Sequence, residues 1–211
     1  GGSLGPELHL EHGTPQGQSY RKAGDGTEQF LTTYYSSDGV TLSLQDRSNG
    51  NETSAVLGGG DGYEAPTKGG GVATDGEFVY VADGGELYVY TRAEIEDAAS
   101  QGRVAEPEYV DGDIAAGSFV EVKDGKLYVG NFNTPPDGPF EQYQGEPDLY
   151  QYTIEDGRLT DRKWLGDIPY YVQDVAITDD GVIYSRSYSN KEHSPHYLTV
   201  QKFDGNGQLE P

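Results

Sequence analysis

Hydrophobic and polar residues alternate in short runs along the whole chain, as they do in strands with one buried face. The clearest run, residues 78–83, reads Phe-Val-Tyr-Val-Ala-Asp, with an Asp-Gly turn before it and a Gly-Gly turn after it. A second alternating run follows at 86–91. Asp-Gly and Gly-Gly between alternating runs are typical of tight hairpins. Residues 71–91 are therefore predicted to form three consecutive antiparallel strands.

The same unit recurs three more times, at residues 18–44, 120–154 and 175–203. A fourth strand fits at 53–57, 108–110 and 162–165. Repeats of four antiparallel strands at this period are typical of propeller blades, because one small sheet cannot bury both its faces alone. We predict an all-β fold, a β-propeller of four-stranded antiparallel blades. A β-sandwich with the same strand spacing is the alternative.

The repeat divides the chain into parts. Residues 1–6 are expected to be a linker, or a remnant left by cloning or by processing, and 7–211 the propeller domain, with blades near 13–58, 69–111, 116–166 and 171–211. The fourth unit ends before an outer strand. Residues 7–12 alternate, so we expect them to form a strand that completes this blade and closes a four-bladed ring. The alternative is that a closing blade is missing from this chain.

One helix is expected in a connection between blades. Thr91 and Glu94 form the pattern of a capping box, in which Glu94 reaches back to the start of the helix. Residues 95–100 continue the helix, and Gly102 ends it. This element carries no functional implication.

The net charge of −22, from 36 acidic and 14 basic residues, excludes some classes of partner. Such a surface repels phosphates, so no nucleic acid is expected to bind. No stretch approaches the roughly 18 apolar residues of a membrane span. The chain has no cysteine, which excludes a disulfide scaffold and a cysteine nucleophile. An acidic surface of this kind suits high salt, where repulsion is screened, so we expect a halophilic character.

Several segments resemble secreted bacterial and archaeal β-propellers of uncharacterised role, namely residues 12–17, 69–73 with 79–83, 118–120 with 127–132, and 172–176 with 184–188. The resemblance covers nearly the whole chain, and its motifs are structural. It implies an extracellular or cell-surface location and a closing blade beyond the four units. The blades are more distantly similar to calcium-dependent lactonase and gluconolactonase propellers, which hold a metal at the mouth of the central channel. The ligands of that metal have no matching positions in this sequence.

In a propeller, loops at one end of the channel converge on a concave site. Seven residues of these loops are candidate ligand-binding residues: Asn131, Asn133, Tyr171, Gln173, Arg186, Tyr188 and Asn190. Amides, guanidinium groups and aromatic rings are what a polyhydroxylated ligand requires. If the site forms, Asn131, Arg186 and Tyr188 should meet in one pocket. The alternative is that these residues only shape turns.

Two sets of residues could bind metal ions. Asp204, Asn206 and Gln208 carry oxygen atoms at alternate positions, as in the first half of a calcium loop, although the same residues suit an ordinary hairpin turn. The histidines form two pairs, His9 with His12 and His193 with His196. On a strand the spacing i, i+3 places two side chains on opposite faces, so neither pair is expected to chelate.

No serine elbow, phosphate-binding loop or zinc-protease helix is present in the sequence. We therefore expect a non-catalytic extracellular binding or assembly module with a carbohydrate-like ligand, or a protein partner in an assembly. The first alternative is a calcium-dependent hydrolase or lactonase that uses the same channel mouth. The second is a structural subunit of a surface layer or filament.

Overall fold

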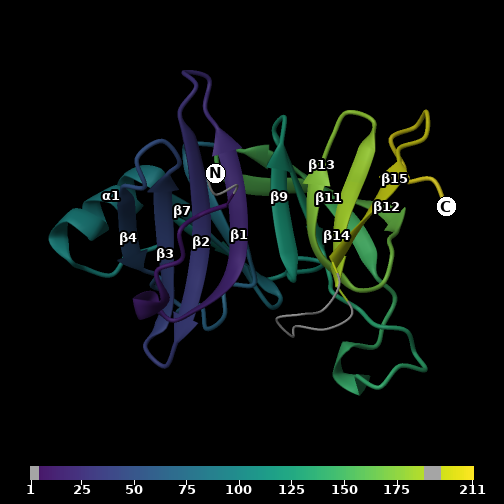
Figure 1. Ribbon diagram of the computed structural model, residues 1–211, viewed down its shortest axis with the longest axis horizontal. Coiled ribbons are helices and arrows are strands. Elements are labelled where there is room, and N and C mark those ends of the chain that lie inside the picture. Colours follow the sequence, from purple (N-terminus) through teal and green to yellow (C-terminus); the bar gives the residue numbers. More distant parts are fainter. Residues whose placement is uncertain (1–4, 188–195) are drawn as a thin grey trace.

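The computed structural model describes residues 5–187 and 196–211 and is a four-bladed β-propeller (Figure 1). Each blade is an antiparallel sheet of consecutive strands. The first sheet contains β1 (Thr14–Lys22), β2 (Glu28–Ser36), β3 (Gly39–Asp46) and β4 (Glu52–Val56). The second contains β5 (Gly71–Thr74), β6 (Phe78–Asp83), β7 (Glu86–Thr91) and β8 (Tyr109–Asp111).

The third sheet contains β9 (Phe119–Lys123), β10 (Lys126–Gly130), β11 (Asp148–Glu155) and β12 (Arg158–Asp167). The fourth contains β13 (Val172–Ile177), β14 (Gly181–Ser187) and β15 (His196–Lys202), three strands within the described residues. The first strands of the blades lie innermost, since β5 packs against both β1 and β9, and β9 packs against β13. The predicted fold class is confirmed.

Each pair of neighbouring sheets is joined by its own hydrophobic core. Alternation along β6 shows how the cores are separated, because Val79 and Val81 pack toward the first sheet while Phe78 and Tyr80 pack toward the third. A third core, which includes Leu149 and Tyr184, joins the third and fourth sheets. Because successive side chains of a strand point to opposite faces, each internal blade contributes apolar side chains to the cores on both of its sides.

Alternation along the fourth repeat predicts that Ile183 and Leu198 are buried between blades, and this burial is only partly observed. Ile183 is half-buried, and the side chain of Leu198 is 72% exposed. The prediction for Leu198 is wrong because it assumed that both faces of this sheet are covered. The face that carries Leu198 points away from the third blade and has no sheet upon it.

Residues 7–12 do not form a ring-closing strand. Leu10–His12 form the 3-10 helix η1, and the segment lies across the first sheet, where the His9 amide donates to the Tyr34 hydroxyl at 3.1 Å. A 3-10 helix has three residues per turn, which aligns side chains i and i+3. His9 and His12 therefore both face Glu52, with nitrogen–oxygen distances of 3.6 and 2.8 Å. The opposite-face expectation fails because it assumed a strand.

The expected helix is α1 (Arg92–Gln101). The Thr91 hydroxyl accepts from the Glu94 amide at 3.0 Å, and Gly102 ends the helix in the left-handed conformation. The carboxylate of Glu94 does not reach back. It binds the guanidinium of Arg103 at 2.6 and 2.8 Å, which lowers its pKa to about 2. In the described part of the chain, no helix has the length and apolar character needed to cross a membrane.

Candidate functional site

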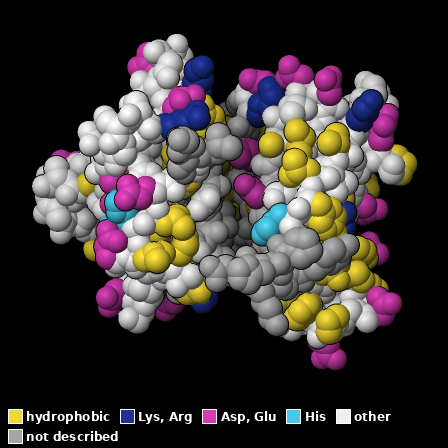
Figure 2. Space-filling model, in the orientation of Figure 1, with side chains coloured by type: hydrophobic (Ala, Val, Ile, Leu, Met, Phe, Trp, Pro, Cys, Tyr) yellow, Lys and Arg dark blue, Asp and Glu magenta, His cyan; other side chains and the backbone are white. Residues whose placement is uncertain are grey.

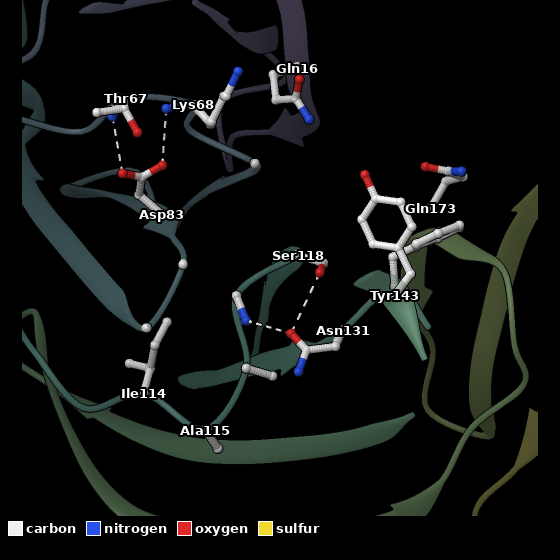
Figure 3. A pocket seen from close by; sticks show the side chains of 16 residues that line it. Gln16, Thr67, Lys68, Asp83, Ile114, Ala115, Ser118, Asn131, Tyr143 and Gln173 are labelled. Carbon is white, nitrogen blue, oxygen red and sulfur yellow. Dashed lines mark hydrogen bonds between the residues drawn. The ribbon is translucent and has the colours of Figure 1, made fainter. Parts of the chain in front are cut away.

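A cavity of about 630 Å³ opens at one end of the channel, where residues of all four blades meet (Figure 3). The loops that lead into β5 and β9, the β6–β7 turn and the segment after β10 supply most of its wall. β1 and β13 contribute the rest. The lining residues are Gln16, Thr67, Lys68, Gly70, Asp83–Gly85, Ile114–Ser118, Asn131, Phe132, Tyr143 and Gln173. We call this cavity the mouth pocket.

Part of the wall of the mouth pocket consists of backbone alone. At Gly117 a Cβ atom would lie 2.0 Å from the carbonyl oxygen of Gly84, so no larger residue fits there. A Cβ atom at Gly70 would in turn be 3.5 Å from the Gly117 carbonyl. The turn of the second blade and the loop into the third are thus in direct backbone contact. We call these three residues the glycine wall.

Asp83 fixes the loop that leads into the second blade. Its carboxylate accepts hydrogen bonds from the backbone amides of Thr67, Lys68 and Gly69, all at 3.0 Å (Figure 3). These contacts place Lys68 at the rim, with its amine 4.1 Å from the centre of the Tyr35 ring. Asp83 is therefore occupied in shaping the loop.

The side-chain amide of Asn131 is held by hydrogen bonds to its oxygen atom, which leave its nitrogen atom without a protein partner among the described residues. Its Oδ1 accepts from the Gly117 amide at 3.1 Å and from the Ser118 hydroxyl at 3.5 Å (Figure 3). Among the described residues, none binds its Nδ2 group. This NH₂ group is a fixed donor available to a ligand in the mouth pocket.

Three aromatic rings cluster beside Asn131. The Phe132 ring lies edge-on to that of Tyr143, with centroids 5.4 Å apart, and 6.3 Å from that of Tyr171. Phe132 and Tyr143 line the pocket. Tyr171, whose ring contacts that of Phe132, has a left-handed backbone with φ 65°, and its amide donates to the Asn133 carbonyl at 2.8 Å.

The structure separates the predicted site residues into groups. Asn131 and Gln173 line the mouth pocket together. Asn133 does not line it, because its Nδ2 donates to the Tyr143 carbonyl at 3.0 Å and holds the insertion between β10 and β11. Tyr188 and Asn190 lie outside the described residues.

Arg186 is engaged within its own blade. Its Nε donates to the Tyr170 carbonyl at 2.7 Å and its Nη1 to the Thr199 hydroxyl at 3.2 Å, while the guanidinium lies 5.0 Å from the centre of the Tyr197 ring. It is absent from the described lining of the mouth pocket. These contacts are those of a residue that joins β14 to β15.

Lys68 and Tyr143 line the pocket but were not predicted. Tyr143 belongs to the short 3-10 helix η2 (Glu141–Tyr143) inside the long insertion of the third blade. Insertions into an otherwise regular repeat are frequent sites of function. The length of this insertion was the signal that could have indicated Tyr143.

Deeper in the channel lies a second cavity of about 280 Å³, which shares Gln16, Gly70 and Gln173 with the mouth pocket. Asp174 lines it, and Glu121 stands on the neighbouring inner strand β9. Each carboxylate accepts a hydrogen bond from the next backbone amide in the chain. Burial raises the pKa of Glu121 to about 8 and that of Asp174 to about 6, and the Asp174 charge adds to the rise at Glu121. Figure 2 shows acidic side chains in the hollow between the blades.

The proposed calcium residues form a turn after β15. The Asp204 carboxylate accepts from the amides of Asn206 and Gln208, at 2.7 and 3.0 Å, as an aspartate does in a tight turn. The Gln208 side chain lies against the carbonyls of Trp164 and Leu165. Over residues 5–187 and 196–211, no group of three or more His, Asp or Glu side chains is placed to hold a metal ion.

No family model matches the sequence, and no curated protein matches it. The fold is similar to a crystal structure of a putative 6-phosphogluconolactonase from Bacteroides uniformis, with a TM-score of 0.50 and 16% identity. The match covers 100% of this chain, which spans 57% of the length of that structure. An extracellular domain of a putative hybrid two-component system from B. thetaiotaomicron matches with a TM-score of 0.28 and 13% identity, over 96% of this chain and 34% of its own. The first likeness shows that the chain shares the propeller fold of a lactonase-like structure.

Proposed function

We propose that this protein is a non-catalytic binding module of the cell exterior that takes a carbohydrate-like ligand in the mouth pocket. The observation that carries the proposal is the fixed NH₂ group of Asn131 beside the rings of Phe132 and Tyr143. Sugar hydroxyl groups accept from such a donor, and the C–H faces of a sugar ring pack on aromatic rings. The resemblance to secreted propellers supports the location.

The remaining lining residues also favour binding over catalysis. Asp83 is the only acidic residue in the described lining, and both of its oxygen atoms are bound by backbone amides. A general acid or base needs a free oxygen within reach of the ligand. A volume of about 630 Å³ is within the usual range of small-ligand sites.

The test is a glycan array followed by calorimetry on wild type and Asn131→Asp. Aspartate keeps the oxygen that accepts from Gly117 and Ser118 but removes the NH₂ donor. The loss of this donor, together with the added charge, should weaken binding about tenfold or more. Asn49→Asp, in the exposed β3–β4 turn, adds the same charge away from the pocket and should bind as wild type does.

Two results would overturn this assignment. If wild type binds no glycan on the array, the carbohydrate ligand is wrong. If Asn131→Asp binds as tightly as wild type, then the ligand does not use the mouth pocket donor. Tyr143→Ala gives an independent check of the ring surface, because it leaves the Asn131 contacts unchanged.

The second candidate function is hydrolysis in the channel, as in the calcium-dependent lactonase alternative. Glu121 and Asp174 favour it, because buried carboxyl groups with raised pKa values can donate and accept protons near neutral pH. The measurement is lactone and ester hydrolysis with and without calcium chloride. Activity that is lost in both Glu121→Gln and Asp174→Asn would favour the enzyme over the binding module.

A further inference from the structure

A cavity of about 420 Å³ lies between the first and second blades. The β1–β2 turn, the β5–β6 turn and Arg92, the first residue of α1, form most of its wall. Gln16, near the start of β1, lines the mouth pocket, whereas Arg21, near the end of that strand, lines this cavity. Five residues of extended strand span about 17 Å. The cavity, which we call the turn pocket, is therefore a separate site at the other end of the inner strands.

Arg21 brings a guanidinium group to the turn pocket. The other arginines of the chain each make a side-chain hydrogen bond, an ion pair or a ring contact, namely Arg47, Arg92, Arg103, Arg158, Arg162 and Arg186. Within residues 5–187 and 196–211, the Arg21 side chain makes none of these contacts, although it is half-buried. Its N–H groups are therefore available as donors to a ligand.

The backbone of the β5–β6 turn fixes the place of this guanidinium group. A Cβ atom at Gly76 would lie 2.7 Å from its Nη2 atom and 2.8 Å from its Cζ atom, so the group rests directly on the glycine. Gly76 also has φ 101°, a conformation that favours glycine. The first blade thus reaches onto the second at a position where any larger residue would displace the Arg21 side chain.

Arg92 supplies a second guanidinium group from the neighbouring blade. Its Nη2 donates to the Oε1 of Gln29, and its Nε lies 3.3 Å from a carboxylate oxygen of Glu96. Arg21 and Gln29 are paired residues of β1 and β2, and the side chains of such a pair are neighbours on one face of the sheet. The Gln29 side chain is therefore adjacent to both guanidinium groups. Guanidinium groups bind the two oxygen atoms of a carboxylate in a fixed geometry.

The acidic residues of the turn pocket are either already bound or exposed at its rim. The Asp75 carboxylate accepts from two backbone amides of its own turn and from the Tyr80 hydroxyl, at 3.0, 2.8 and 2.8 Å. Asp25 and Glu77 are exposed. Among the described residues, none donates a hydrogen bond to the Glu77 carboxylate. Positive charge therefore lies in the half-buried part of the pocket, and unbound negative charge lies at the rim.

This arrangement of charges discriminates between kinds of ligand. Three acidic and two basic residues line the pocket, so a doubly charged phosphate or sulfate ion meets net repulsion there. A ligand with a carboxylate at one end and an ammonium group at the other is complementary to both the interior and the rim.

We propose that the turn pocket binds a small zwitterion, whose carboxylate pairs with Arg21 and Arg92 and whose ammonium group lies beside Glu77. A free α-amino acid is the simplest ligand of this class. A volume of about 420 Å³ is within the usual range of small-ligand sites. The proposal is independent of the mouth pocket and of its ligand.

The experiment is isothermal titration calorimetry on the full chain with a panel of free L-amino acids, and with acetate and inorganic phosphate for comparison. One or more amino acids should bind about tenfold more tightly than acetate or phosphate. Arg21→Gln should weaken this binding about tenfold or more, because the carboxylate loses a charged partner. Lys22→Gln is the matched control and should bind as wild type does. It removes the same charge from the next residue of β1, whose side chain points to the opposite face.

Glu77→Gln tests the ammonium end of the ligand. It should weaken amino-acid binding several-fold without weakening acetate binding, because acetate has no ammonium group. Circular dichroism checks that each variant keeps its strand content. The proposal is overturned if wild type binds no amino acid with a Kd below about 10 mM, or if Arg21→Gln binds as tightly as wild type. Phosphate that binds more tightly than every amino acid would show that the pocket is a simple anion site, and the zwitterion would be wrong.

Discussion

At the scale of single residues, Glu121 and Asp174 are carboxyl groups placed where ionisation is costly. Burial raises both pKa values, to about 8 and about 6, from ordinary values of 4.5 and 3.8. The folded chain therefore binds more protons than the unfolded chain between about pH 4 and pH 8. The contribution of these two groups to the free energy of unfolding is therefore largest near pH 4 and decreases as pH rises toward 8.

Replacing Glu121 with glutamine should remove part of the decrease in the free energy of unfolding that occurs as pH rises. We predict that Glu121→Gln is more stable than wild type at pH 8 by about 1–2 kcal/mol, while the two differ little at pH 5. Urea unfolding at both pH values measures this. Glu77→Gln, at an exposed carboxylate, should follow wild type. A variant with the same pH slope as wild type would show that Glu121 ionises freely.

At the scale of elements, the sequence was most informative where the turn residues and the alternation of the flanking strands predict the same structure. The Asp-Gly and Gly-Gly turns around 78–91 predicted β6, β7 and the start of α1, because turn chemistry and alternation agree there. It was least informative in short irregular pieces. Residues 7–12 alternate as a strand does, but the backbone amides of Glu7 and His9 donate to the side chains of Gln45 and Tyr34. Such long-range contacts cannot be predicted from the local sequence pattern.

The same limit applies to the site. Asn131 could be predicted because it directly follows the second strand of its repeat, and Gln173 because it lies at the start of an inner strand. Arg186 occupies such a place as well, but its side chain turns toward Tyr170 and Thr199, a choice made by tertiary contacts. Lys68 enters the pocket through a loop that Asp83 holds across the second blade. These contacts join residues far apart in the sequence.

The hydrogen bonds of Arg186 to Tyr170 and Thr199 indicate that its removal should lower stability. We predict that Arg186→Ala lowers the free energy of unfolding by about 1–3 kcal/mol, because two charged-donor hydrogen bonds between β14 and its surroundings are lost. Arg47→Ala removes only an exposed pair with Glu28 and should cost less than about 1 kcal/mol. Chemical denaturation of both variants makes the comparison. Equal effects would mean that the Arg186 contacts add nothing to stability.

At the scale of the whole molecule, charge opposes the compact state. Acidic residues outnumber basic ones by 36 to 14, so folding concentrates negative charge. We predict that the melting temperature rises steadily from about 0.1 M to about 2 M sodium chloride, as screening shortens the range of repulsion. Differential scanning calorimetry at several salt concentrations makes the measurement. A melting temperature that stays flat or falls with salt would contradict a halophilic surface.

The glycine wall limits which parts of the mouth pocket can accept substitutions during evolution. A side chain at position 117 would collide with the Gly84 carbonyl, so mutation cannot reshape that wall without moving two blades apart. The insertion that carries Tyr143 is under no such restriction, because surface loops accept substitutions and changes of length. New ligand preferences in related proteins should therefore arise by variation of the insertion, while Gly117 stays fixed.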